Sequence, residues 1–163
     1  MHGILKQVTK VEELEIYAEH IAPLAKNLIS YYPEFKDEEN FLNLLINIVP
    51  DPKVGIFVHV GQGKLNGIAV IETGTSYMGS ALCEIIMAAC NEPEVSKEFM
   101  ANLEQWARDQ GMERIQAGSG RARGPFIRYM EKYGYNEAYT LVVKELHDNE
   151  TQNDLQATHK TAA

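Results

Sequence analysis

Cysteine is scarce in this sequence: its 163 residues contain two, Cys83 and Cys90. If both lie on one extended strand, they are about 23 Å apart at roughly 3.3 Å per residue, which is too far for a disulfide. This excludes a disulfide-stabilised secreted scaffold. It favours a reducing interior such as the cytoplasm.

Long apolar runs and clustered histidines are also missing. The longest apolar stretches, such as Ile85 to Cys90, are far shorter than the roughly 20 residues of a membrane-spanning helix. No pair of the five histidines has metal-binding spacing, so we expect no metal site. His59, inside a predicted strand, is expected to be a packing or surface residue. Neither membrane insertion nor a metal centre is therefore predicted.

Arginine is absent from the first 100 residues, which carry seven lysines and 14 acids for a net charge of −7. All five arginines lie between residues 108 and 128, and the whole chain has a net charge of −8. This acidity argues against duplex nucleic acid or an anionic membrane as the main partner. Within Gly118–Gly124, Arg121 and Arg123 could clamp an anion. Alternatively, these arginines face water or pair with neighbouring acids.

Hydrophobic periodicity predicts an α/β chain with a mixed sheet. The predicted helices cover residues 11–30, 35–49, 95–110 and 125–133, and the predicted strands cover 54–60, 65–72, 81–90, 112–117 and 139–146. Residues 1–146 would form one domain, and residues 147–163 a polar C-terminal tail. Thr9 and Glu12 fit a capping box, and Pro23 should kink or divide the first helix.

Three segments carry a family resemblance: Cys83–Ile86, Leu103–Ile115 and Phe126–Tyr135. Together they resemble the second half of the GCN5-related N-acetyltransferases, the GNAT superfamily. The shared pattern is a central strand, then a helix that ends at a glycine and leads into a strand, then a helix that ends before Gly134. The resemblance implies a single α/β GNAT-like domain, with a central, mixed, mostly antiparallel sheet flanked by helices. It also implies acetyl-CoA as cofactor if the protein is catalytic.

Acetyl transfer needs backbone N–H groups at a helix N-terminus to hold the pyrophosphate of CoA, and glycines let the backbone approach it. The resemblance assigns cofactor binding to Val95, Ser96, Lys97, Arg121 and Arg123. However, the matching stretch Asn91–Phe99 contains no glycine and three glutamates. Carboxylates at this loop would repel phosphates, so we expect no cofactor.

Acetyl transfer also needs an acid for the leaving thiolate and a base for the attacking amine. Four residues before Gly134, where the family often has a tyrosine, the sequence has Met130. Tyr129 is one residue away, about 100° around a helix. Glu84 would be a base with a raised pKa if it were buried in its apolar strand. Alternatively, Glu84 points to solvent from the open side of the sheet.

Two functions follow. The first is a GNAT-fold protein without acetyl transfer, a structural or interaction module that binds protein partners or self-assembles. In this it resembles the degenerate GNAT-like proteins of T7-like tailed phages, some of which are virion components, and this would place it in a host cytoplasm or a virion. The second is an N-acetyltransferase that moves acetyl from acetyl-CoA to a small or protein amine. The glycine-free loop favours the first function.

Overall fold

The computed structural model describes residues 3–29, 37–76, 78–118 and 123–138. Its helices are α1 (Val11–Ile29), α2 (Glu38–Ile48), α3 (Pro93–Asp109) and α4 (Arg123–Glu131). Its strands are β1 (Ile4–Val8), β2 (Val54–Gly61), β3 (Lys64–Thr75), β4 (Ala81–Cys90) and β5 (Arg114–Ala117). The predicted strand 139–146, the tail 147–163 and Arg121 lie outside the described residues.

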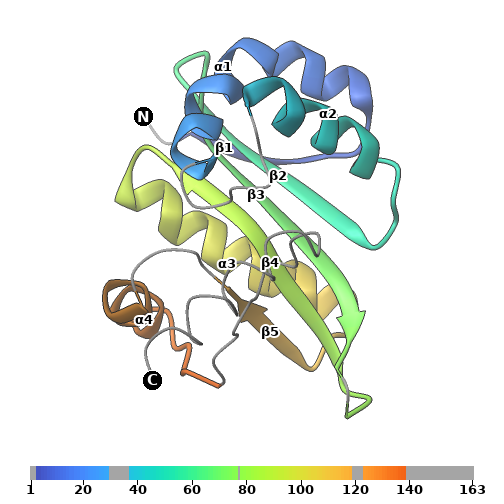
Figure 1. Cartoon of the computed structure of the whole chain (residues 1–163), viewed down its shortest axis with the longest axis vertical. Coiled ribbons are helices and arrows are strands. Elements are labelled where there is room, and N and C mark those ends of the chain that lie inside the picture. Colours follow the sequence, from blue (N-terminus) through green and yellow to red (C-terminus); the bar gives the residue numbers. More distant parts are fainter. Residues whose placement is uncertain (1–2, 30–36, 77, 119–122, 139–163) are drawn as a thin grey trace, which may run out of the picture.

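The five strands form one mixed sheet in the order β1-β2-β3-β4-β5 (Figure 1). The pairs from β1 to β4 are antiparallel, and β4 pairs with β5 in parallel. This confirms the predicted α/β class and the mostly antiparallel sheet. Strand β1 was not predicted, because its sequence Ile-Leu-Lys-Gln-Val does not alternate between apolar and polar residues.

At the start of helix α1, the predicted capping contact of Thr9 involves Glu13, one residue later than the sequence pattern indicated. The carboxylate of Glu13, and not that of Glu12, accepts a hydrogen bond from the backbone N–H of Thr9 at 2.8 Å. The same carboxylate pairs with Lys6 of β1, also at 2.8 Å. Pro23 does not divide α1, which is continuous over 19 residues. The Lys6–Glu13 contact therefore joins β1 to the start of α1.

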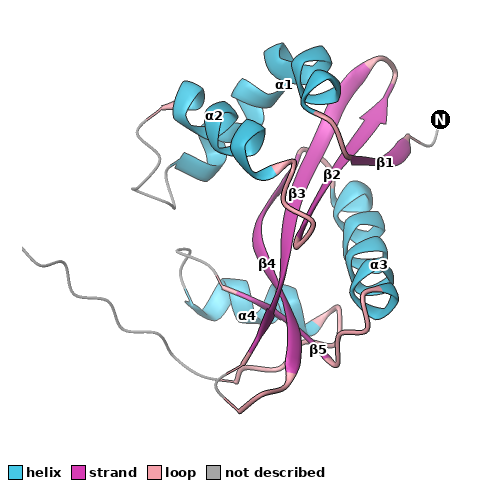
Figure 2. Ribbon diagram, turned by 90° about the vertical axis from the view of Figure 1, so that its right-hand side faces the viewer, coloured by secondary structure: helices cyan, strands magenta, loops and turns pink. Residues whose placement is uncertain are grey.

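Helices α1 and α2 cover one face of the sheet, and α3 covers the other (Figure 2). The α1–α2 core contains inward-facing side chains of both helices and of β2, β3 and β4, including the fully buried Leu14, Phe41 and Leu45. The α3 core contains Phe99 and Leu103 of α3, residues of β2, β3 and β4, and a methionine of α4. Each face of the sheet is thus buried against its own helices.

A β-bulge between β3 and β4 moves side chains of β4 from one core to the other. Val70 lies opposite Met87, whereas Ile71 lies opposite Ile85, so Ile86 is the extra residue. As a result, Ile85 packs in the α3 core and Met87 in the α1–α2 core, although strict alternation would place both on one face. The bulge directly follows the last residue pair between β4 and β5.

Candidate functional site

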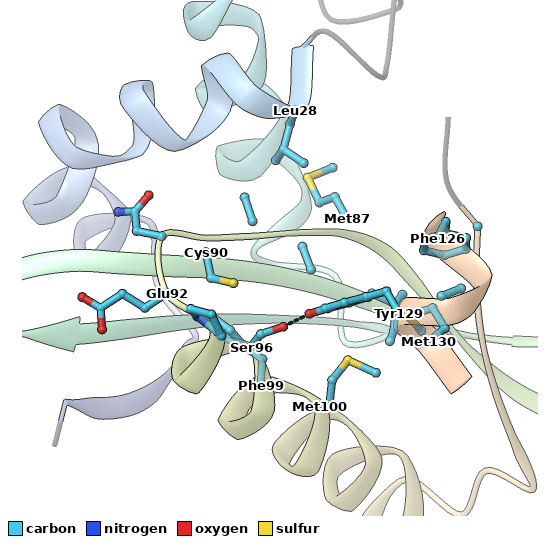
Figure 3. Close-up of a pocket in the computed structure, with 17 residues that line it drawn as sticks. Leu28, Met87, Cys90, Glu92, Ser96, Phe99, Met100, Phe126, Tyr129 and Met130 are labelled. Carbon is cyan, nitrogen blue, oxygen red and sulfur yellow. Dashed lines mark hydrogen bonds between the residues drawn. The ribbon is translucent and has the colours of Figure 1, made fainter. Parts of the chain in front are cut away.

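Strands β4 and β5 separate after Ile85. Strand β5 pairs with β4 only as far as Ile85 and Ala117, whereas β4 continues to Cys90 along β3. The separation leaves a cavity of about 380 Å³, which is at the small end of the range for ligand pockets. The cavity is bordered by β4, the N-terminal turns of α3, helix α4 and Leu28 of α1 (Figure 3).

Two hydroxyl groups meet in this cavity. Ser96 of α3 and Tyr129 of α4 form a hydrogen bond between their hydroxyls, and Ser96 is only 8% exposed (Figure 3). The ring of Tyr129 packs edge-on against Tyr133, with centroids 5.4 Å apart. Tyr129 therefore reaches the cavity, although it lies one residue before the position at which the family often has a tyrosine as the catalytic acid. The structure brings these two predicted site residues together.

The first turn of α3 borders one end of the cavity. Helix α3 begins at Pro93, and the N-cap residue Glu92 makes no capping hydrogen bond with its side chain. Val95 is buried in the α3 core, and Lys97 is exposed and does not line the cavity. Of the three α3 residues that the sequence assigned to cofactor binding, only Ser96 faces the cavity.

Glu98 points away from the cavity toward β2. Its carboxylate lies 3.1 Å from Nε2 of His59, which is 4% exposed and packs edge-on against Phe99 with ring centroids 6.5 Å apart. The sequence placed the three glutamates of Asn91–Phe99 where the phosphates of CoA would lie, and for Glu98 this is wrong, because its carboxylate is directed to β2. Among the two expectations for His59, the structure supports a packing residue.

Glu84 is exposed on β4 and does not line the cavity. In the sheet register it lies opposite Glu72 of β3 and opposite Gln116 of β5. The hypothesis that Glu84 is a buried base is therefore wrong, because its side chain is exposed. The alternative, in which Glu84 faces solvent, agrees with the structure. Like charges opposite each other on adjacent strands are mildly destabilising, so the Glu72–Glu84 pair adds nothing to the stability of the sheet.

Arg123 is exposed at the start of α4. Its Nε donates a hydrogen bond of 2.8 Å to Oε1 of Glu137, and the two side chains form an ion pair. This agrees with the alternative in which a loop arginine pairs with a neighbouring acid. Since Arg121 lies outside the described residues, the described part of the chain places no arginine at the cavity.

Two groups with raised pKa values lie away from the cavity. Burial, together with the nearby carboxylate of Glu104, raises the pKa of Tyr135. Burial also raises the pKa of the Cys83 thiol. Neither residue lines the cavity, so these shifts keep core groups neutral and do not prepare a nucleophile there.

Sequence reasoning missed the apolar walls of the cavity. They include Met87 and Cys90 of β4, Met100 of α3, and Phe126 and Met130 of α4. Each of these residues fits the apolar pattern of its own element, and no local signal separates a cavity wall from a filled core. Their role arises only from the separation of β4 and β5.

Within the described ranges, no three His, Cys, Asp or Glu side chains are grouped so that they could hold a metal ion. In the same part of the chain, no helix combines the length and the apolar character needed to cross a bilayer.

Neither the protein-family models nor the curated proteins match this sequence. Solved structures match it well. An aminoglycoside N-acetyltransferase in complex with CoA aligns with a TM-score of 0.71 and 15% identity, over 89% of this chain and 95% of that chain. A ribosomal-protein-alanine N-acetyltransferase from Brucella melitensis biovar Abortus has a TM-score of 0.66 and 10% identity, over 89% and 99%. A GNAT family acetyltransferase from Staphylococcus aureus has a TM-score of 0.64 and 16% identity, over 90% and 100%.

These similarities define the class of fold: a mixed, twisted α/β sheet of the kind found in acetyltransferases. The chain has the GNAT fold, as the resemblance of its second half implied. At 10–16% identity this likeness concerns the fold alone, and activity has to be argued from the site.

Proposed function

We propose that this protein is a non-catalytic binding module with the GNAT fold, which does not transfer acetyl groups from acetyl-CoA. The observation that carries the proposal is the first turn of α3, where Glu92, Pro93 and Glu94 stand in place of a glycine-rich phosphate loop. This turn does not fit the pyrophosphate of CoA in two respects: its hydrogen-bond donors and its charge.

The turn offers few hydrogen-bond donors. Pro93, at the start of the helix, has no N–H group. The N–H of Ser96 already donates to the backbone carbonyl of Glu92 at 3.3 Å. Of the four donors that a helix start normally presents, the N–H groups of Glu92, Glu94 and Val95 remain. A pyrophosphate, with acceptor oxygens on both phosphates, is matched less well by these three donors than by a helix start without proline.

The charge of the turn is also unfavourable for phosphate. A helix N-terminus carries the equivalent of roughly half a positive charge. Glu92 and Glu94 are exposed and contribute two full negative charges, of which Lys97 in the next turn offsets one. The turn therefore does not attract phosphates, in contrast to the usual helix N-terminus.

Binding of acetyl-CoA, measured by thermal unfolding and by calorimetry, tests the proposal. We expect millimolar acetyl-CoA to leave the Tm unchanged. A ligand at a hundred times its Kd would stabilise the fold by about 2.7 kcal/mol and raise the Tm of a domain of this size by roughly 5–10 °C. A shift of that size contradicts the proposal.

A pair of double variants isolates the charge. If the carboxylates of the turn oppose phosphate, the Glu92→Gln/Glu94→Gln variant should bind CoA better than the wild type. The Glu12→Gln/Glu39→Gln variant removes the same charge from exposed positions on α1 and α2 and should not. Equal binding by the two variants would mean that the charge of the turn is not the obstacle.

Under this proposal the protein works by contact with other molecules. Protein partners or self-assembly, a cytoplasmic or virion location and a phage origin stay predictions of the sequence resemblance. Sedimentation velocity of the purified protein over a wide range of concentrations measures self-assembly. If the protein is a monomer at every concentration, self-assembly is excluded, and the proposed contacts must be with other proteins.

The Ser96–Tyr129 hydroxyl pair favours one alternative, an acetyl-CoA-dependent N-acetyltransferase that acts on a small or protein amine. A phenol in the cavity is the kind of group that protonates a leaving thiolate. This alternative requires acetyl-CoA binding by the wild type. If binding occurs, Tyr129→Phe should retain binding and lose turnover, and unchanged turnover would exclude Tyr129 as the acid.

A further inference from the structure

We infer that the cavity between β4 and β5 binds a small apolar ligand that carries one positive charge, of the alkylammonium class. The inference rests on the proposed function, because it assigns to another ligand the cavity that a CoA-dependent enzyme would use for its cofactor. Three features of the cavity carry it: its size and walls, the charge at one end, and the hydroxyl pair between the ends.

The size and walls of the cavity fit a short apolar chain. A volume of about 380 Å³ suits a ligand at the small end of those that proteins enclose. The walls include Leu28, Phe126 and three methionines, Met87, Met100 and Met130. Methionine side chains are flexible and polarisable, so they adapt to apolar ligands of irregular shape. Apolar contact with these walls would supply most of the binding free energy.

A carboxylate marks one end of the cavity. Glu92 and Phe126 lie at opposite ends, and Glu92 is the one charged residue among the described residues that line the cavity; its side chain is exposed, and its carboxylate points away from the Ser96–Tyr129 pair (Figure 3). The half positive charge of the α3 N-terminus only partly offsets this full negative charge. A cationic head group is therefore favoured at the solvent-facing mouth of this end, with its apolar chain in the cavity, and an anionic head group is disfavoured.

The polar groups between the two ends already satisfy each other. The hydroxyls of Ser96 and Tyr129 share a hydrogen bond and lie between Glu92 and Phe126 (Figure 3). A ligand that passes them needs no matching polar group along its chain. An apolar chain with one cationic head thus fits the cavity better than a ligand with many hydroxyls or phosphates.

Cys90 provides a direct measure of whether the cavity is filled. It lines the cavity and is half-buried, whereas Cys83 is 0% exposed in the α3 core. The rate at which a thiol-alkylating reagent modifies Cys90, followed by mass spectrometry, should fall when a ligand occupies the cavity. Cys90→Ala confirms which thiol reacts. The probes are octylammonium, octanol and octanoate, which share one chain and differ in the charge of the head.

Octylammonium should protect Cys90 at about a tenfold lower concentration than octanoate, since an exposed charge pair changes affinity only by this order. Glu92→Gln should abolish the preference for the cation. Glu39→Gln, which removes the same charge from an exposed position on α2, should leave the preference unchanged. Equal protection by octylammonium and octanoate, a preference that persists in Glu92→Gln, or no protection by any probe overturns the inference.

Acetyl-CoA in the same assay separates this inference from the proposed function. Protection of Cys90 by acetyl-CoA contradicts the proposed function, whatever the alkyl probes do. Failure of octylammonium without protection by acetyl-CoA overturns the inference alone. If Cys90 does not react in the ligand-free protein, isothermal titration calorimetry compares the same probes and variants, and the same order of affinities is expected.

Discussion

The two sides of strand β4 differ in how they are paired. On the side of β3, pairing extends along the whole strand from Ala81 to Cys90, and the space on each face is filled by the α1–α2 core or the α3 core. On the side of β5, pairing stops at Ile85, and the cavity follows. The side chains next to β4 are similarly apolar on the β3 side and on the β5 side. The extent of strand pairing, and not the type of residue, therefore decides where the protein has room for a ligand.

Buried polar side chains divide the molecule in a second way, by the two faces of the sheet. Among the described residues they are His59 and Ser96, which contact Glu98 of α3 and Tyr129 of α4. The α1–α2 core contains only apolar side chains in that part of the chain. The core on the α1–α2 face is thus apolar, whereas the two buried polar side chains lie at α3, and of these two Ser96 is the one that lines the cavity.

The largest test of this comparison is one substitution made on both sides. Phe41 is 0% exposed in the α1–α2 core, so Phe41→Ala should lower the free energy of unfolding by about 3–5 kcal/mol. Phe126 is half-buried at the cavity wall, where it already borders empty space, and Phe126→Ala should cost about 1 kcal/mol. Urea denaturation measures both values. Similar losses would mean that the cavity wall is packed as tightly as the core.

A smaller effect is expected where α3 approaches β3. A Cβ atom at Gly67 would lie 2.5 Å from the ring of Phe99 and 3.0 Å from Val95, so Gly67→Ala should destabilise the protein by about 1–3 kcal/mol. At Gly74 on the same strand, a Cβ would meet nothing within 4 Å, and Gly74→Ala should change stability by at most about 0.5 kcal/mol. Equal urea midpoints for the two variants would indicate that α3 can move away from the sheet without cost.

Sequence patterns predicted those helices and strands whose buried residues recur at one regular spacing along the element. Helix α3, predicted over 95–110 and observed over Pro93–Asp109, keeps a single apolar face along its length. Strand β4 was predicted with its observed bounds, since a run of apolar residues is typical of a strand that is buried on both faces. Strand β1 has no such period, because it lies at the edge of the sheet and only Val8 is buried.

The site could be predicted only in part, because it depends on tertiary features. The bulge at Ile86 reverses the faces of β4, and the separation from β5 begins beside it. Neither feature has a signature in the local sequence. Tyr129 was placed about 100° from the expected position on its helix, yet its long side chain reaches Ser96. A rule based on helical spacing takes no account of side-chain length, so it did not predict that the Tyr129 hydroxyl reaches the cavity.

The smallest expected effect concerns the Lys6–Glu13 contact on the α1–α2 side. A hydrogen bond from Lys6, followed by that from the backbone of Thr9, lowers the pKa of Glu13 from 4.5 to about 2. Since the pKa is lower in the folded state, the ionised carboxylate stabilises the fold above pH 4.5, and this contribution is lost as the pH falls toward 2. The difference in stability between wild type and Glu13→Gln should therefore shrink over that pH range.

Glu12, which is exposed in the same first turn of α1, provides the matched control for this titration. Urea denaturation should show a difference between wild type and Glu12→Gln that varies less with pH than that for Glu13→Gln. Because the Lys6–Glu13 contact joins β1 to α1 at the far edge of the sheet from β5, Glu13→Gln should also leave the alkylation rate of Cys90 at neutral pH unchanged. A faster rate in this variant would show that the edge at β1 and the separation of β4 from β5 are coupled, and that the two sides of β4 do not behave independently.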